Sequence, residues 1–221
     1  MLMTTTEQVT NQPQAHSALQ AAHEGGYRFP ATFAGFSADV QVERDGVAQT
    51  GRVTLGSPRE IEIDLDADDE TLGWLRQELG SMAGHRWPTP YAESDGRWTL
   101  TLDEGAGHPL GYLIRVHDDP FNSSYRLRGG RITQVNRQMG PTRFSINIHE
   151  HTPTADGRTL PAVFTVAFWD TAQGRLSRTD EYLDRYVEVD GVQLPAERRV
   201  LRVEDDGISV RKMTLSGHTL L

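Results

Sequence analysis

The second half of the chain is a succession of runs in which apolar and polar residues alternate, with turn residues between them. Alternation with a period of two places successive side chains on opposite faces of a β-strand. Several of these runs, such as RLSRTDEYLDRYVEV, are longer than the five or six residues of a usual strand. The pattern predicts a long antiparallel meander in one large curved sheet rather than a compact sandwich.

The hairpin expected over residues 186–200 shows how such runs are joined. Asp190-Gly191 lies between two alternating runs, and a tight type I′ turn needs positive φ at both central residues, which glycine adopts without strain. Pro195 follows four residues later and has no N–H to donate, so its strand must begin, bulge or lie at an edge there. We expect the second arm to pair fully only after Pro195.

The first half of the chain adds three strands and two helices. The region 33–65 predicts three strands, with an Asp45-Gly46 turn and a clean alternation over 60–65. Residues 15–24 are good helix formers followed by Gly25-Gly26, a typical helix stop. Between Asp68, a plausible N-cap, and Gly84, a plausible stop, apolar residues recur at helical spacing: Leu72, Leu75, Leu79 and Met82.

These elements predict a mainly β (α+β) fold, a half-barrel in which the two helices cover the concave face of a single sheet. Residues 1–13 are polar and are expected to form a disordered tail, and residues 14–221 are expected to form a single curved-sheet domain. The run from Ala162 to Trp169 is apolar on both faces. We expect that strand to be central and covered on both sides.

Composition excludes several classes of function. The net charge of −9 and the pI near 5.3 argue against nucleic-acid binding, which relies on lysine and arginine. The chain has no cysteine, so disulfides, thiolate metal sites and cysteine nucleophiles are excluded. The first residues lack a basic and apolar leader, and no run is long enough to span a membrane. We expect a cytoplasmic protein, and the sequence indicates no particular protein partner.

One candidate metal site stands at residues 149–151. His149 and His151 are two apart on a predicted strand, so both could face one metal ion. The same face carries Arg143, Ser145 and Asn147, which makes a solvated strand face the simpler interpretation. Both interpretations stay open, with the solvated face favoured.

A second feature is an arginine-rich segment without acids. Between Phe121 and His149 the sequence contains no Asp or Glu, although the chain as a whole is acidic. Arginine's planar guanidinium suits a carboxylate or a phosphate, so an anionic head group is one interpretation. Pairing with the protein's own acids, such as those in DEYLDRYVEVD, is the other. By alternation, Arg126 and Arg128 share one face and Arg131 and Arg137 share another. The segment's arginines are Arg126, Arg128, Arg131, Arg137 and Arg143.

Polar residues in the same strands add to this picture. Gln134 and Asn136 alternate with Thr133 and Val135, and they would help to recognise a ligand if their side of the sheet were buried, or would face water if it were not. Motifs of hydrolases, nucleotide-binding loops and zinc helices are absent, so the sequence supports no enzymatic activity and no cofactor.

The order of motifs resembles an uncharacterised family, domain of unknown function 3386 of cyanobacteria and chloroplasts. The resemblance covers residues 18–203 and rests on FAGFSADVQV, WLRQELGSMAGHR, NSSYRLRGGRITQVNRQMG and YVEVDGVQLPAERRV. More distantly, the pattern is similar to the LolA-like periplasmic lipoprotein carriers. That likeness implies a half-barrel fold that holds acyl chains.

The leading hypothesis is a non-enzymatic carrier or binding protein for a lipid-like or isoprenoid-like amphiphile in the concave sheet. The alternatives are a structural or interaction module with a self-filled core and, less favoured, a metal-dependent enzyme using His149 and His151. The predicted ligand-binding residues are Tyr125, Arg126, Arg128, Arg131, Gln134, Asn136 and Arg137.

Overall fold

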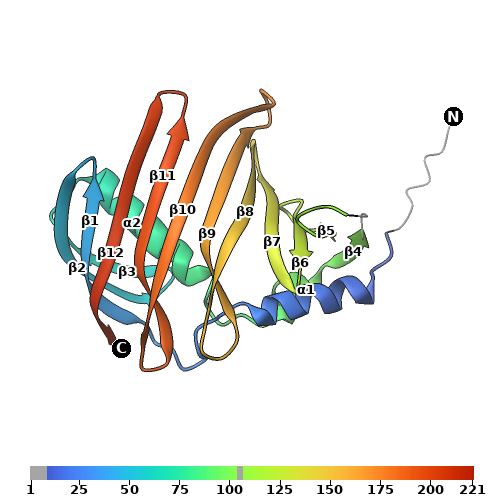
Figure 1. Cartoon of the computed structure of the whole chain (residues 1–221), viewed down its shortest axis with the longest axis horizontal. Coiled ribbons are helices and arrows are strands. Elements are labelled where there is room, and N and C mark those ends of the chain that lie inside the picture. Colours follow the sequence, from blue (N-terminus) through green and yellow to red (C-terminus); the bar gives the residue numbers. More distant parts are fainter. Residues whose placement is uncertain (1–8, 104–106) are drawn as a thin grey trace.

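The chain forms one twelve-stranded antiparallel sheet in the computed structural model, which describes residues 9–103 and 107–221. The strand order is β3-β2-β1-β12-β11-β10-β9-β8-β7-β6-β5-β4, so β3 and β4 form the two edges. Figure 1 shows the sheet curving around α2. The elements are α1 (Pro13–Gly25), β1 (Phe36–Arg44), β2 (Val47–Ser57), β3 (Glu60–Asp64), α2 (Asp69–Gly84), the short 3₁₀ turns Tyr91–Glu93 and Asp95–Arg97, β4 (Thr99–Asp103), β5 (Tyr112–His117), β6 (Ser124–Arg128), β7 (Arg131–Met139), β8 (Thr142–Pro153), β9 (Thr159–Asp170), β10 (Arg175–Val189), β11 (Val192–Glu204) and β12 (Gly207–Leu220).

The expected half-barrel with two helices is confirmed. Asp68 caps α2, and its carboxylate accepts a hydrogen bond from the Thr71 N–H at 2.7 Å. The buried side of α2 packs on β1, β11 and β12 in one core cluster that includes Trp74, Leu75, Leu79, Met82, Val200 and Met213. The buried side of α1 packs on β4, β5 and β6 in a second cluster that includes Ala15, Leu19, Leu100, Ile114, Tyr125 and Leu127.

Both helices lie on the same face of the sheet. Directly opposed residues of an antiparallel pair point to the same side, so pairing partners trace a face from strand to strand. From Val200 under α2, the partners are Tyr182, Phe164 and Ile148. From Tyr125 under α1, they are Val135, Ile146 and Val166, which lies on the same side of β9 as Phe164. We call this the concave face, and the opposite one the convex face.

The hairpin over 186–200 forms as expected at its turn. Asp190 and Gly191 have φ values of 48° and 79°, as a type I′ turn requires. Pairing with β10 starts at Val192, and a bulge follows Pro195, because Tyr186 faces Pro195 whereas Arg185 faces Glu197. Pairing with β12 begins only at Glu197. β11, the second arm of the hairpin, is therefore paired with both β10 and β12 only after Pro195.

One expectation about β9 is wrong. The strand is central, seventh in the order, but it is not covered on both sides. Most residues from Ala162 to Trp169 are half-buried, and Val166 is the fully buried one among them. The physical reason is reach: helices of 13 and 16 residues are roughly 20 and 24 Å long, while twelve strands span roughly 53 Å.

The start of the chain is described from Val9 onward. Residues 9–12 are exposed, and α1 begins at Pro13, where a boundary was expected. The disordered tail was expected over residues 1–13, and residues 1–8 of it lie outside the described part. None of the described helices is both long and apolar enough to cross a membrane.

Candidate functional site

An apolar strip on the concave face lies between the two helices. It consists of side chains from β8 and β9 that belong to neither core cluster. All except Val166 are half-buried, so water reaches them. Partly exposed apolar side chains in a contiguous set are typical of a contact surface rather than of a finished core. The members of the strip are Phe144, Ile146, Ile148, Phe164, Val166 and Phe168.

The register orders the strip into rows across the sheet. Phe144 lies opposite Phe168, Ile146 opposite Val166, and Ile148 opposite Phe164. The row of Ile148 and Phe164 continues to Tyr182, whose ring stacks on Phe164 with centroids 4.7 Å apart. The rows are continuous because β8 and β9 pair without a shift over this stretch.

Arg137 and Tyr125 border the strip on the side of α1. Arg137 lies opposite Phe144, and its guanidinium donates a hydrogen bond to the Tyr125 hydroxyl at 2.9 Å. That hydroxyl donates in turn to the Asp95 carboxylate at 3.1 Å. Desolvation raises the pKa of Tyr125 to about 12, so the phenol stays neutral and able to donate. The Nε atom of Arg137 is buried without a hydrogen-bond partner in the described residues.

His85 at the end of α2 faces the same positive surroundings. His85 is an exposed residue by surface area, yet nearby protein atoms partly desolvate its ring. Desolvation comes first, followed by the positive charges of Arg86, Arg137, Arg198 and Arg28, and together they lower the pKa of His85 to about 4. Arg137 is thus one of the charges that act on His85, which follows the last residue of α2.

A buried ion network lies on the concave face under α2. Arg198 donates to both carboxylate oxygens of Asp184 at 2.7 and 2.6 Å, and to Glu78 of α2 at 2.8 Å. All three residues are at most 4% exposed. Arg86 lies 4.0 Å from the Asp184 carboxylate, so two arginines face two carboxylates here. The network therefore fixes α2 on β10 and β11 rather than offering a free ligand contact.

Family comparison gives a clear result. The family model "Protein of unknown function (DUF3386)" matches residues 10–221. The chain belongs to this family. No curated protein sequence matches the DUF3386 protein.

Several solved structures align with the DUF3386 protein. A LolA superfamily protein from Nitrosomonas europaea is 12% identical, with 94% of this chain and 93% of that chain covered and a TM-score of 0.37. A domain described as an outer membrane lipoprotein-sorting protein, from Vibrio parahaemolyticus, is 10% identical with coverages of 94% and 92% and a TM-score of 0.40. MucB in complex with MucA from Pseudomonas aeruginosa is 12% identical, with coverages of 91% and 93% and a TM-score of 0.23. Likenesses this weak carry no argument about ligands.

The DUF3386 protein divides the predicted ligand residues between its two faces. Tyr125 and Arg137 lie on the concave face beside the strip. The other five lie on the convex face, because they alternate along β6 and β7 with Leu127 and Val135, which face the concave side. Arg131 shares a face with Arg128 and not with Arg137, because Thr133 is an extra residue in β7 that shifts the register. The five convex residues are Arg126, Arg128, Arg131, Gln134 and Asn136.

The convex polar residues bind one another and the backbone. Gln134 donates to Asn147 at 2.7 Å, and Asn136 donates to Ser124 at 3.2 Å. Arg126 donates to the Gly111 carbonyl at 3.0 Å, and Arg128 donates to the Pro109 carbonyl at 2.9 Å. These contacts satisfy donors within the protein.

Ion pairing of the arginine segment with the protein's own acids is not found. In the described residues no carboxylate lies within 4.0 Å of any of the five arginines from Arg126 to Arg143. The acids of β10 pair instead with arginines of β10 and β11, as Asp180 does with Arg202.

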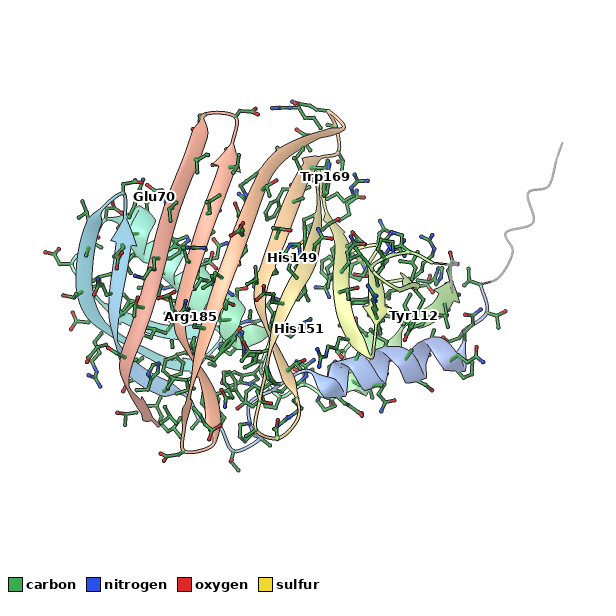
Figure 2. All side chains as sticks on the ribbon, viewed as in Figure 1. Glu70, Tyr112, His149, His151, Trp169 and Arg185 are labelled. Atoms are coloured by element: carbon green, nitrogen blue, oxygen red, sulfur yellow. The ribbon has the colours of Figure 1, made fainter. Side chains whose placement is uncertain are left out.

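The two histidines of β8 lie where its pairing with β9 is irregular. His149 is an extra residue in the ladder, since Ile148 and Glu150 pair with the consecutive residues Phe164 and Val163. Its ring bonds the Thr165 hydroxyl at 3.1 Å. Figure 2 shows His149 and His151 on β8. Among residues 9–103 and 107–221, no group of three or more His, Asp or Glu side chains could hold a metal ion.

Sequence reasoning missed Arg178 of β10. It lies opposite Phe168, with its guanidinium carbon 3.9 Å from the ring centroid. Its place between Ser177 and Thr179 in an ordinary alternating run gave no distinguishing signal, because only the pairing register brings it to the strip.

Proposed function

We propose that the DUF3386 protein is a non-enzymatic binding or carrier protein for a lipid-like or isoprenoid-like amphiphile. The apolar part of the ligand lies on the strip of β8 and β9, and an anionic head group contacts Arg137. The observation that supports this proposal is that the half-buried Phe144 lies opposite Arg137, which has no carboxylate within 4.0 Å among the described residues.

Charge and apolar surface act together in this proposal. Covering the strip removes apolar side chains from water, which is favourable at about 25 cal/mol per Å². An anion at Arg137 receives charge-assisted hydrogen bonds in a partly desolvated place, where they are stronger than in water. The net charge of the chain is −9, so an anion is accepted only where an arginine without an ion pair, such as Arg137, offsets that charge.

The alternative is a structural or interaction module whose concave face is filled by its own side chains. The two core clusters fill much of the concave face with the chain's own side chains, and this observation favours the alternative. A metal-dependent enzyme has no such observation behind it. The expected cytoplasmic location stays a prediction, which cell fractionation with an antibody checks.

The experiment compares two arginines on neighbouring strands and opposite faces. The purified protein is analysed by native mass spectrometry and solvent extraction, and is then titrated with fatty acids and isoprenoid phosphates at rising salt. We expect binding that weakens about tenfold to a hundredfold in Arg137→Ala, since one charge-assisted contact contributes roughly 1.5–3 kcal/mol. Arg126→Ala is the matched control on the convex face and is expected to bind like the parent.

The two outcomes separate the candidates. Binding lost in Arg137→Ala and kept in Arg126→Ala supports the concave site. The carrier function fails if extraction yields nothing and no amphiphile binds at micromolar concentration, and the interaction module then becomes the better explanation. Equal losses in both variants would place the anion elsewhere.

A further inference from the structure

The row of the strip nearest the β9–β10 turn is flanked by one arginine on each side. Its members, from β7 to β10, are consecutive cross-strand partners: Arg137, Phe144, Phe168 and Arg178. The centroids of the two phenylalanine rings lie 6.0 Å apart, and the Arg178 guanidinium lies over the Phe168 ring. The other rows of the strip do not have an arginine at each end, because Val135 and Asp180 border the row of Ile146 and Val166.

Both arginines keep unused hydrogen-bond donors. The Nε atoms of Arg137 and Arg178 are buried without a hydrogen-bond partner in the part of the chain that the structure describes. Arg137 uses one terminal nitrogen on Tyr125. The terminal nitrogens of Arg178 donate to no described residue. They are not among the buried atoms that lack a partner, so they are in contact with water.

The two positive charges are also incompletely neutralised. The carboxylate nearest to Arg178 is that of Asp180, which lies 3.3 Å from its Nε without hydrogen-bond geometry. Arg137 interacts with Asp95 and Asp119 only from beyond 4.0 Å. Arg202 already binds both oxygens of Asp180 at 2.9 and 3.1 Å. One carboxylate is thus shared by two arginines, and Arg137 has none within 4.0 Å among the described residues. The row retains positive charge at both ends.

The spacing of the two charges follows from sheet geometry. Three steps between neighbouring strands separate Arg137 on β7 from Arg178 on β10. At about 4.8 Å a step, their Cα atoms are roughly 14 Å apart across the sheet. A ligand that spans the row from one arginine to the other is therefore elongated, and the side chains that it crosses are the apolar Phe144 and Phe168.

We infer that the ligand of the strip carries an anionic group at each end and lies across the strands from β7 to β10. One acidic group contacts Arg137 and the other contacts Arg178, while the apolar middle covers Phe144 and Phe168. The chemical class is an α,ω-dicarboxylate or a similarly two-ended dianion. This inference deepens the proposed function and rests on it, since a ligand with one head group would leave one arginine unused.

The test compares dodecanoate with dodecanedioate, which have the same chain length and differ in the second carboxylate. Calorimetric titration of the parent protein is expected to show tighter binding of the dianion by about tenfold to a hundredfold, an advantage that shrinks as salt rises. This comparison needs no variant, so it holds whatever a substitution does to folding.

Variants then assign the two ends. Arg178→Gln and Arg137→Gln are each expected to abolish the advantage of dodecanedioate over dodecanoate, while Arg178→Lys keeps part of it. Arg143→Gln is the control, because Arg143 lies on the convex face next to Phe144 and contacts Trp169. Thermal melting of each variant confirms that it is folded.

The outcomes separate this inference from the proposed function. If both ligands bind equally and Arg178→Gln has no effect, the two-ended ligand is wrong and the carrier function stands. If dodecanoate, dodecanedioate and the amphiphiles of the earlier titration all fail to bind, both fall together.

Discussion

Arg198 and Asp184 face each other across β11 and β10 and form a two-bond ion pair beneath α2. Glu78 of α2 completes the contact from above the sheet. The pair joins a helix to strands far away in sequence, because residues 78 and 198 meet only when α2 lies on the concave face. It therefore reports whether that arrangement is correct.

We expect Arg198→Ala to lower the free energy of unfolding by about 3–5 kcal/mol. The substitution leaves two buried carboxylates without their shared partner. Urea denaturation measures the loss. The control is Arg199→Ala, which removes the next residue, whose half-exposed side chain lies 3.9 Å from Glu181; there we expect a change below about 1 kcal/mol. Equal effects of the two substitutions would contradict the buried network.

The same variant is expected to change the pH dependence of stability. Desolvation raises the pKa of Glu78 in the parent protein, and Arg198 counteracts that rise. Without Arg198 the folded-state pKa rises further above the unfolded one. Glu78 then adds stability to the folded state below its unfolded-state pKa, and this stability is lost as pH increases through its folded-state pKa. Denaturation at pH 4 to 8, in Arg198→Ala against the parent, checks that stability falls more steeply with rising pH in the variant.

A charge on the buried side of α2 is expected to unfold the protein. Leu75 and Leu79 are completely buried in the core cluster under this helix. Leu75→Asp or Leu79→Asp places an uncompensated charge there at a cost of several kcal/mol, comparable with a total stability of about 5–15 kcal/mol. Gln77→Asp, on the exposed side of the same helix, is the control. Unchanged melting temperatures in both leucine variants would show that α2 does not cover the sheet.

His85 gives an observable for the concave site. Its pKa is lowered to about 4, first by desolvation and then by the positive charges of Arg86, Arg137, Arg198 and Arg28. Its contribution to stability is therefore present above about pH 6.5 and lost as pH falls toward 4. NMR titration of the ring is expected to show this low pKa in the parent protein. The pKa is expected to be higher in Arg137→Ala, and also higher in the parent when an anionic ligand is bound. A pKa near 6.5 that no ligand moves would mean that the surroundings of His85 are not as described.

Elemental analysis addresses the two histidines of β8. Because His149 bonds Thr165 and no three-residue metal-binding group exists in the described residues, we expect no stoichiometric metal in protein purified without an affinity tag. One equivalent of tightly held metal, lost when His149 and His151 are both changed to alanine, would reverse this interpretation.

Much of the fold was predictable from local signals. Alternation located the long strands, and Asp45-Gly46 and Asp190-Gly191 marked turns that have the positive φ values expected. The helical spacing around Leu75 and the Asp68 cap located α2. Each of these signals acts within a few residues of the chain, which is why sequence shows them.

The candidate site was predictable only in part, because it depends on register. The extra residues Thr133 in β7 and His149 in β8 change which side chains share a face, and alternation alone does not reveal such bulges. Tyr125 and Arg137 were found through the arginine segment, whereas Arg178 joins them only by pairing with Phe168. That β9 is apolar on both faces was visible, but how far two short helices reach across the sheet was not.

The most direct test of ligand binding on the concave strip is an NMR measurement of contacts between a bound amphiphile and the methyl groups of β8 and β9. With dodecanedioate or a fatty acid bound, we predict intermolecular nuclear Overhauser effects to Ile146, Ile148 and Val166, and none to Val163 or Leu201 on the convex face. Contacts to the convex methyl groups instead, or saturating ligand without any contact to Ile146 and Ile148, would contradict the concave site.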